Sequence, residues 1–237
     1  METGKKVNIM LVDDHPLYRD GLRNLLAVDE DFRMVAEAGM GVTALNYARM
    51  QDIDVVVMDV ELQTEPDGFA LTAQLRALPR PPAVLMVSMH KAPAYVERAR
   101  QAGAQGYISK DEPSELILYA VDEVAEGRGY WPPVKTQPED KPTPAEMRVL
   151  KYIAQGKISR DIAKILGIKT HTVEAHRYNV RWKRNLKTPA ELPLFAKECM
   201  ELYGIPEDLP KMREKRENNE SASLARRTHP LRQPSSA

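Results

Sequence analysis

Residues 7–14 read Val-Asn-Ile-Met-Leu-Val-Asp-Asp, a mostly apolar run that ends in two carboxylates. Short apolar runs bounded by polar residues are typical of strands buried in a parallel sheet. Three later apolar runs are each followed by a polar side chain, first Asp59, then Ser88 and last Lys110. Ligands bind such sheets outside the carboxyl ends of the strands. The sequence therefore predicts one pocket in which carboxylates, a hydroxyl and an ammonium group meet.

The first 127 residues alternate between apolar runs and amphipathic stretches, which predicts five strand–helix units. The run 32–37 alternates in polarity, as expected of a strand at the edge of a sheet. The predicted fold class is α/β, a doubly wound five-stranded parallel sheet, with a second, smaller all-α domain. Strands are expected at 6–12, 32–37, 54–58, 83–87 and 105–108, and helices at 15–27, 41–51, 67–77, 92–101 and 113–126.

The rest of the chain divides by composition. Five prolines among residues 131–144 favour a semi-rigid linker, which we place at 128–141. Residues 142–206 carry apolar side chains at helical spacing and predict a compact bundle of four short helices. From 207 to 237 apolar residues are scarce and Lys, Arg, Glu, Asn and Ser dominate, so this tail is predicted to be disordered. The two predicted domains are thus 1–127 and 142–206.

The 237-residue chain is neutral overall, but its charges are unevenly distributed. Residues 1–128 hold 13 Lys and Arg against 21 Asp and Glu, whereas residues 141–206 hold 13 against 6. The basic half suits a polyanionic partner, although on charge alone a solvated basic face is equally open. Cys199 is the only cysteine, which fits a reducing compartment, and the sequence has no run of eighteen apolar residues that would predict a membrane span. We expect a cytoplasmic protein with no membrane partner.

The acidic residues predict a site for a metal ion. Carboxylates gathered at one edge of a sheet repel one another unless a cation neutralises them, and Mg²⁺ prefers carboxylate, carbonyl and water oxygens. With the metal held, one carboxylate can attack a phosphoryl group while the metal and Lys110 neutralise the transferring oxygens. Ser88 can then hydrogen-bond the product. The alternative is structural, with Asp13 and Asp14 capping a helix and Asp59 starting a turn.

Four segments resemble the receiver domain of two-component response regulators of the NarL/FixJ branch, and they lie at residues 12–16, 57–59, 87–90 and 102–110. The resemblance implies a flavodoxin-like sheet with the strand order 2-1-3-4-5 and phosphorylation of Asp59 by a sensor histidine kinase. Lys110 would pair with the phosphoryl oxygen, Ser88 would be the switch hydroxyl, and Tyr107 the ring that turns inward. The implied Mg²⁺ ligands are Asp13, partly through water, Asp14, Asp59 and the backbone carbonyl of Glu61.

The loop after Asp59 departs from the pattern of that family. The family usually has a proline four residues after the phosphorylated aspartate and a glycine eight residues after it. Here Gln63 stands in the place of the proline, and Gly68 follows Asp59 by nine residues. This change bears on the rate of phosphorylation and on the lifetime of the acyl phosphate. His15 and His90 flank the same pocket and are expected to be exposed loop residues that bind no metal.

Residues 158–173 predict two helices joined at Gly167, which is the outline of a helix-turn-helix. On the second helix Val173 and Val180, seven residues apart, are expected to face inward. The opposite face can enter the major groove of DNA while flanking cations hold phosphates. The expected DNA contacts are His171, Thr172, Glu174, Ala175, Arg177, Tyr178, Arg181 and Lys187.

The helical half resembles the LuxR-type DNA-binding domain, which in that family follows the receiver. The resemblance lies in residues 143–146, 149–150, 156–157, 161–163, 166–168, 172–177 and 190–192. Ile158 and Lys169 stand where the family usually has a serine that caps a helix, a contact worth about 1 kcal/mol. We expect Ser159 and Thr170, one residue later, to cap the helices instead.

The main hypothesis is a phosphorylation-controlled transcription factor that binds promoter DNA as a homodimer. Arg184 replaces a leucine of the bundle, and we expect Trp182 to cover the resulting gap because its ring is large enough. Together with Ile158 and Lys169, this departure leaves open that the helical half binds a protein partner rather than DNA. A third possibility is an aspartyl-phosphate phosphatase or another metal-assisted hydrolase, for which the sequence offers no second acid or base.

Overall fold

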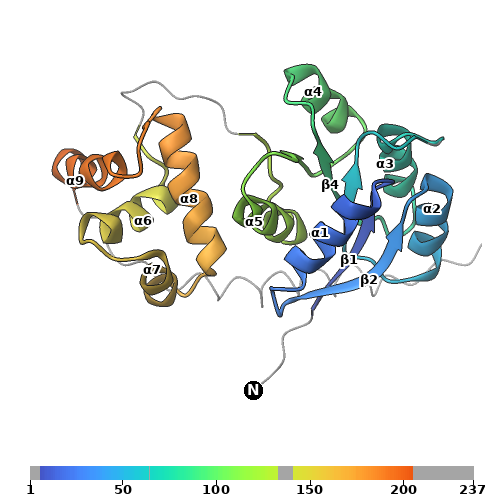
Figure 1. Cartoon of the computed structure of the whole chain (residues 1–237), viewed down its shortest axis with the longest axis horizontal. Coiled ribbons are helices and arrows are strands. Elements are labelled where there is room, and N and C mark those ends of the chain that lie inside the picture. The colour runs from blue at the N-terminus through green and yellow to red at the C-terminus, as the bar shows by residue number, and fades with distance from the viewer. Residues whose placement is uncertain (1–5, 64, 133–140, 205–237) are drawn as a thin grey trace, which may run out of the picture. The chain divides into compact units, whose positions relative to one another are not determined.

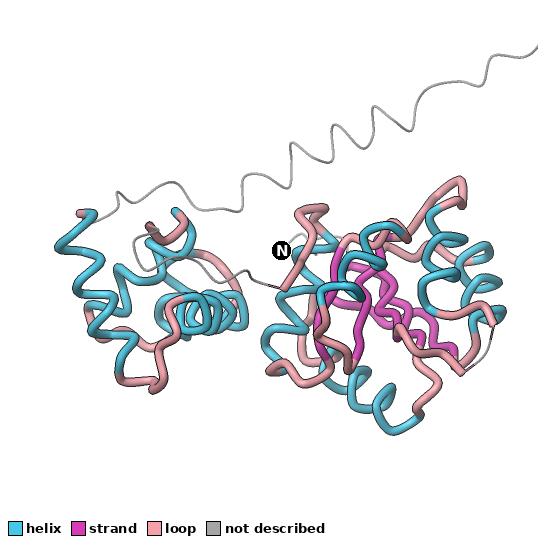
Figure 2. The backbone as a smooth tube through the Cα atoms, turned by 90° about the horizontal axis from the view of Figure 1, so that it is seen from above, coloured by secondary structure: helices cyan, strands magenta, loops and turns pink. Residues whose placement is uncertain are grey.

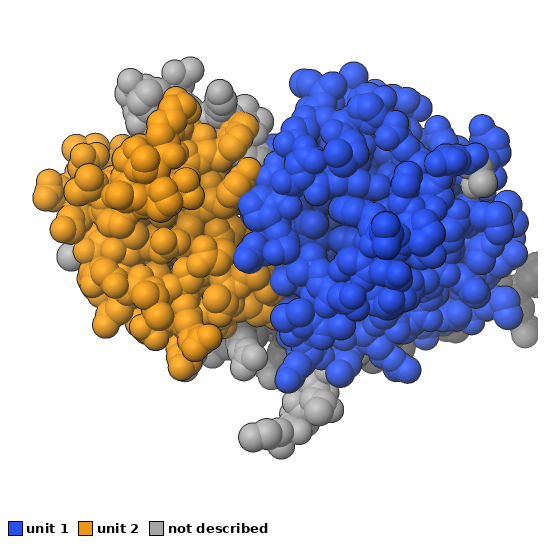
Figure 3. All heavy atoms as spheres, viewed as in Figure 1, with its two compact units in different colours: residues 1–135 blue, residues 136–237 orange. Residues whose placement is uncertain are grey.

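The computed structural model describes residues 6–63, 65–132 and 141–204. The chain divides into two compact units, residues 1–135 and 136–237, which are coloured separately in Figure 3. The predicted tail at 207–237 and residues 133–140 of the predicted linker lie outside the described residues, and the predicted domain boundaries stay predictions. No helix within the described ranges is both long enough and apolar enough to cross a lipid bilayer.

The first unit holds a parallel sheet with the strand order β2-β1-β3-β4-β5, which confirms the predicted fold class (Figure 1). Strand β2 lies at the edge, as its polarity pattern indicates. Every strand and helix begins and ends within one residue of its predicted bounds. The strands are β1 (Val7–Val12), β2 (Phe32–Ala38), β3 (Val55–Asp59), β4 (Ala83–Ser88) and β5 (Gly106–Ser109). The helices are α1 (Pro16–Leu26), α2 (Gly41–Met50), α3 (Gly68–Arg76), α4 (Pro93–Gln101) and α5 (Ser114–Ala125).

Helices cover both faces of this sheet (Figures 1 and 2). Helices α1 and α5 contact each other on one face, and helices α2, α3 and α4 pack on the other. Met10, Met58 and Met86 of the three central strands lie in the core with Leu71 and Leu75 of α3. The central strands are buried on both faces, so their runs are almost wholly apolar. Each fully buried side chain of this size stabilises the fold by about 1.5 to 3 kcal/mol.

The chain returns to the sheet after α5. Tyr130 forms an isolated parallel bridge with Gly106 at the start of β5. The Tyr107 amide donates a hydrogen bond to the Tyr130 carbonyl at 2.7 Å, and the Tyr130 amide donates to the Gln105 carbonyl at 3.1 Å. Gly129 has a φ of +75°, and a Cβ there would lie 2.7 Å from the Gln105 carbonyl oxygen. Sheet contacts therefore continue past residue 127, where we placed the end of the domain.

The second unit contains the four short helices that the sequence predicts. They are α6 (Pro144–Ala154), α7 (Ser159–Leu166), α8 (Thr170–Lys183) and α9 (Glu191–Tyr203). Leu150, Ile162 and Leu192 lie in their common core. Val173 and Val180 of α8 belong to the same core, which confirms the inward face of this helix.

The N-termini of α7 and α8 correct one expectation. Ile158 and Lys169 are the N-cap residues, and neither side chain makes a capping hydrogen bond with a described residue. Ser159 and Thr170 are already the first helical residues, so the expectation that they cap instead is wrong. A residue with helical backbone angles cannot aim its hydroxyl at the free amides of the first turn in the way that an extended N-cap residue can.

The C-terminal end of α8 corrects a second expectation. Trp182 is 36% exposed and is not part of the bundle core. Instead the Arg184 guanidinium lies 5.5 Å from the ring centroid of Phe195, and Leu186 packs against the core. At this end of α8 the residues that contact the bundle are thus Arg184 and Leu186, and Trp182 does not enter the core.

Candidate functional site

The carboxyl ends of three strands bring Asp13, Asp59 and Lys110 together. The Lys110 Nζ lies 2.8 Å from Asp13 Oδ2 and 2.8 Å from Asp59 Oδ2, although the chain separates lysine and carboxylates by 97 and 51 residues. The side chains are only 9%, 3% and 2% exposed for Lys110, Asp13 and Asp59. The sheet order places β1 and β3 side by side, so their terminal carboxylates share one pocket.

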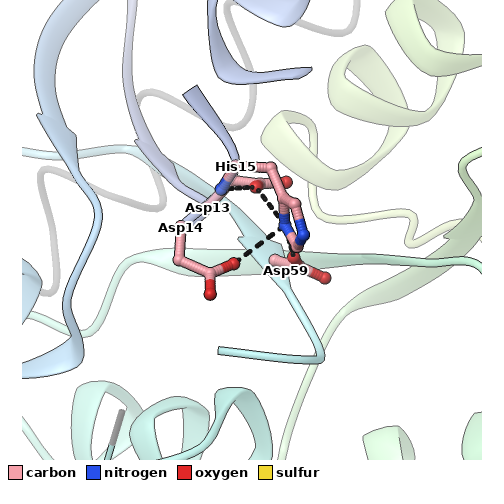
Figure 4. A group of neighbouring side chains, drawn as sticks. All are labelled: Asp13, Asp14, His15 and Asp59. Carbon is pink, nitrogen blue, oxygen red and sulfur yellow. Dashed lines mark hydrogen bonds and ion pairs between the residues drawn. The ribbon is translucent and has the colours of Figure 1, made fainter. Parts of the chain in front are cut away.

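Asp14 and His15 complete the carboxylate pocket (Figure 4). The His15 Nδ1 lies 2.9 Å from Asp14 Oδ1 and 3.4 Å from Asp13 Oδ1. Asp14 Oδ2 accepts a hydrogen bond from the Gln63 amide at 3.1 Å, whereas Asp14 Oδ1 is buried without a hydrogen-bond partner among the described residues. Helix α1 has no side-chain cap within the described part of the chain. The capping alternative for Asp13 and Asp14 is therefore wrong.

The charges of the pocket do not balance. Burial raises the pKa of the Asp59 carboxyl, and the hydrogen bonds from Lys110 and from the Glu61 amide oppose this effect only in part. Burial lowers the pKa of Lys110, but Asp13 and Asp59 raise it more, so that its pKa lies above the usual value. Lys110 thus stays protonated at neutral pH and supplies a single positive charge. Three carboxylates around one ammonium group create a demand for a further cation.

The donor set fits a hard divalent cation. Asp13, Asp14, His15 and Asp59 each offer one ligand atom, and these atoms lie within 4.8 Å of one another. Carboxylate oxygens are the ligands that Mg²⁺ prefers, and Asp14 Oδ1, which accepts no hydrogen bond from the described residues, is available to it. The Glu61 amide donates to Asp59 Oδ1 at 3.1 Å, which holds residue 61 beside the pocket. Its backbone carbonyl stays a predicted ligand.

Gly68 packs against the back of Asp59. A Cβ at this position would lie 2.9 Å from both the Cα and the carbonyl oxygen of Val60, and nearer still to the Asp59 carbonyl oxygen. The Gly68 amide donates to the Val60 carbonyl at 3.3 Å. The glycine therefore keeps the close approach between α3 and β3 even though the loop is one residue longer than the family pattern.

Ser88 and Tyr107 lie on the other side of the pocket. Ser88 is fully buried, and its Oγ accepts a hydrogen bond from the His90 amide at 3.0 Å. The Tyr107 ring is buried, burial raises its pKa, and its hydroxyl donates to the His90 carbonyl at 2.5 Å. The His90 ring lies 2.8 Å from Glu61 and stacks on Tyr95 at 4.2 Å. Sequence reasoning missed these His90 contacts, because only the fold brings the loops after β3 and β4 together.

Tyr18 is a second residue that sequence reasoning missed. The Lys110 Nζ lies 4.4 Å from its ring centroid, so the ring face supports the ammonium group beside the carboxylates. Burial, followed by the charges of Asp13 and Asp59, raises the pKa of the phenol. The hydroxyl has no hydrogen-bond partner among the described residues. Its position on the first turn of α1, four residues after Asp14, is the signal that could have identified it.

In the second unit α7, Gly167 and α8 form the predicted helix-turn-helix. Gly167 adopts the left-handed conformation at φ 66° and ψ 31°, and the Ile168 amide donates to the Ala163 carbonyl at 3.0 Å. The predicted DNA contacts lie on α8 at His171, Thr172, Glu174, Ala175, Arg177, Tyr178 and Arg181, with Lys187 just beyond its end. Their role stays a prediction.

One cation of α8 has a structural partner. The Lys183 Nζ lies 2.7 Å from Glu146 Oε1, and Glu146 also forms the capping box of α6 with Thr143. Burial raises the pKa of Glu146, but Lys183 and Thr143 lower it more, so that it lies below the usual value. The mostly buried His176 ring lines a small cavity with Arg148 and other residues of the bundle. Because Lys183 pairs with Glu146, its role is to stabilise the bundle.

Each of the two units matches a known protein family. Residues 9–122 match the family "Response regulator receiver domain", and residues 143–196 match "Bacterial regulatory proteins, luxR family". The chain is 36% identical over 194 residues to the transcriptional regulatory protein UhpA of Escherichia coli strain K12, covering 78% of this chain and 95% of UhpA. It is 33% identical over 196 residues to the nitrate/nitrite response regulator protein NarP of the same strain, covering 76% and 89%. A solved structure of a two-component response regulator of the LuxR family from Aurantimonas sp. SI85-9A1 covers 53% of this chain and 89% of its own, with 33% identity and a TM-score of 0.51.

Proposed function

Because the chain belongs to the NarL/FixJ-type response regulators, which are DNA-binding transcription regulators and not enzymes, we propose that phosphorylation of Asp59 controls its activity. One observation carries the proposal. Asp59 ends β3 in a buried pocket where Lys110 lies 2.8 Å from its carboxylate and where the carboxylates of Asp13 and Asp14 lie close enough to share a cation with it. These are the groups that a phosphoryl transfer to a carboxylate requires.

Each residue of the pocket has a separate role in the phosphoryl transfer. An Asp59 oxygen attacks the phosphorus of a phosphohistidine on a sensor kinase, so that an O–P bond forms and the N–P bond breaks. Lys110 neutralises a transferring oxygen, and the Glu61 amide orients the carboxylate. Asp13, Asp14 and Asp59 hold Mg²⁺, which supplies charge neutralisation when bound. The Ser88 hydroxyl donates to the acyl phosphate.

The helical unit provides the response. Phosphorylation shifts the population toward a homodimer in which the predicted α8 residues contact two promoter half-sites. The Tyr107 ring is already buried, with its hydroxyl on the His90 carbonyl, and the movement of Ser88 toward the phosphoryl group stabilises this inward position. The protein acts in the cytoplasm, where both kinase and DNA are accessible. The match of residues 143–196 to the luxR family favours DNA over the alternative of a protein partner.

The test compares Asp59→Asn with Asp20→Asn in the full-length protein. Asp20 is a control carboxylate on α1 that pairs with Arg23 at 2.8 Å, outside the pocket. With acetyl phosphate and Mg²⁺, we expect labelling of the unmodified protein and of Asp20→Asn, and none of Asp59→Asn. In a gel-retardation assay, the phosphodonor should strengthen the binding of genomic DNA fragments by the wild-type protein and by Asp20→Asn, but not by Asp59→Asn. Labelling that persists in Asp59→Asn would contradict the proposal.

A further inference from the structure

Tyr18 of α1 contacts Lys110, the residue that follows β5. The Lys110 Nζ lies over the ring of Tyr18, 4.4 Å from its centroid. We propose that Tyr18 is a positioning residue for the phosphoryl transfer, and that its ring face holds Lys110 where the ammonium group can neutralise a transferring oxygen at Asp59. This inference rests on the proposed function and assigns a further residue to it.

The helix brings the ring to the strand ends. Tyr18 is the third residue of α1, which begins at Pro16. Neighbouring residues of a helix project about 100° apart, so they face different surroundings. Leu17 is 88% exposed, whereas the Tyr18 hydroxyl is buried. Tyr18 is therefore the residue of this first turn that faces inward, toward the same strand ends that carry the lysine.

The ammonium group of Lys110 has partners of two kinds. Its Nζ donates to Asp13 Oδ2 and to Asp59 Oδ2 at 2.8 Å each, and it lies over the Tyr18 ring. Both carboxylates change in the proposed reaction, because Asp59 becomes an acyl phosphate and Asp13 is a predicted metal ligand. The ring is chemically unchanged throughout. It can therefore keep the ammonium group in place while the carboxylate contacts are being exchanged.

A neutral ring face suits this role. A lysine side chain has many rotamers, and a fixed partner reduces the conformational freedom that would otherwise misplace its charge. The attraction between an ammonium group and a ring face is stronger when both are desolvated, and the Lys110 side chain is only 9% exposed. Burial also raises the pKa of the Tyr18 phenol, so the ring stays neutral. A ring face offers no lone pair and competes little for the three N–H donors of the ammonium group.

Two other interpretations of Tyr18 predict different results. The hydroxyl could be the group that acts, although it has no hydrogen-bond partner among the described residues. In that case Tyr18→Phe would be as slow in phosphorylation as Tyr18→Leu. The ring could also serve only to fill space. In that case rings of the same shape would be equivalent, whatever the charge distribution on their faces.

The experiment measures the initial rate of labelling of the full-length protein with acetyl phosphate and Mg²⁺. Tyr18→Phe keeps the ring and should stay within about twofold of the wild-type rate, whereas Tyr18→Leu should be about tenfold slower. Phenylalanines with one, two and three fluorines at position 18 weaken the negative ring face step by step and should lower the rate in the same order. Tyr119→Leu is the matched control. It removes a half-buried ring of α5 that packs edge to face on Tyr130 at 5.9 Å, and it should leave the rate unchanged.

NMR spectroscopy detects the contact without any phosphodonor. The ammonium protons of Lys110 lie over the ring face, so a ring current should shift their signal upfield in the wild-type protein and in Tyr18→Phe. The shift should be lost in Tyr18→Leu. A lysine signal that is the same in all three proteins would contradict the contact itself.

Equal labelling rates across the fluorinated series would overturn the inference, as would a normal rate in Tyr18→Leu or a tenfold loss in Tyr18→Phe. The fluorinated series decides the matter even if Tyr18→Leu fails to fold, because its members keep the shape of the ring. The proposed function fails separately, through labelling that persists in Asp59→Asn. A ring-current shift together with persistent labelling would remove the phosphorylation site but keep the contact between Tyr18 and Lys110.

Discussion

Replacement of Gly68 by alanine tests the link between α3 and the reactive carboxylate. The added Cβ would lie 2.9 Å from the Val60 Cα and 2.9 Å from the Val60 carbonyl oxygen, and nearer still to the Asp59 carbonyl oxygen. Favourable carbon contacts begin at about 3.5 Å. The clashing atoms all belong to the backbone, so no flexible side chain can move aside. Either α3 or the end of β3 must shift by roughly 1 Å.

This shift should lower the free energy of unfolding of Gly68→Ala, and it should lower the rate of Asp59 labelling more strongly. Overpacking of a buried site typically destabilises a protein by about 1 to 3 kcal/mol, and we expect Gly68→Ala to fall in that range. The displaced end of β3 carries Asp59, which must stay 2.8 Å from Lys110 to receive a phosphoryl group. A misplacement of about 1 Å can slow a reaction by about 10²-fold, so labelling by acetyl phosphate should slow by roughly 10- to 100-fold.

Gly21→Ala is the matched control. Gly21 is exposed on α1, and a Cβ there would meet no atom within 4 Å. Alanine in an exposed helical position stabilises by about 0.5 to 1 kcal/mol relative to glycine. Urea denaturation should therefore show a lower stability for Gly68→Ala and a higher one for Gly21→Ala, whereas the initial rate of labelling should fall in Gly68→Ala and stay unchanged in Gly21→Ala.

The reasoning would be refuted if Gly68→Ala matched the wild-type protein both in urea denaturation and in the initial rate of labelling. A gain in stability like that of Gly21→Ala would have the same meaning, since it would show that the space behind Asp59 can hold a methyl group. A loss of stability with normal labelling would show that α3 moves and leaves Asp59 in place.

Three further outcomes follow from the buried polar groups. Burial lowers the pKa of His176 from 6.5 to about 4. The unfolded chain therefore takes up a proton that the folded bundle excludes, and stability that is complete above pH 6.5 should fall by about 3 kcal/mol as the pH drops through 4. Urea titrations of His176→Gln should lack this loss, and an unchanged pH profile would contradict the assignment. Lys183→Met leaves Glu146, only 6% exposed, without its cation and should destabilise the bundle by about 1 to 2 kcal/mol, given that Lys183 is itself 22% exposed. The control Lys164→Met, at an exposed position of α7, should leave the unfolding midpoint unchanged. Equal midpoints for Lys183→Met and Lys164→Met would show that the ion pair between Lys183 and Glu146 does not stabilise the bundle. Tyr18→Phe removes a buried hydroxyl without a partner among the described residues and should raise the free energy of unfolding by about 1 kcal/mol, whereas a decrease would reveal a bond that the hydroxyl makes to water.

Much of this protein follows from local patterns. Apolar runs such as residues 7–12 predict buried strands, and the polar residues that follow them predict the pocket, because the ends of parallel strands meet at one edge of the sheet. The inward positions of Val173 and Val180 follow from helical spacing in the same way. In each case the relevant information lies within a few residues, or in the fixed geometry of a regular element.

The tertiary structure decided the contacts that join separate segments. Helical spacing did not show that Arg184 lies over Phe195 while Trp182 stays exposed. The sequence did not show that His15 turns toward the carboxylates or that Tyr18 supports Lys110. Side-chain direction at the end of a strand or helix depends on charges and space supplied by distant parts of the chain. Sequence determines which residues reach the pocket, and only packing and the electrostatics of the folded chain decide which way they point.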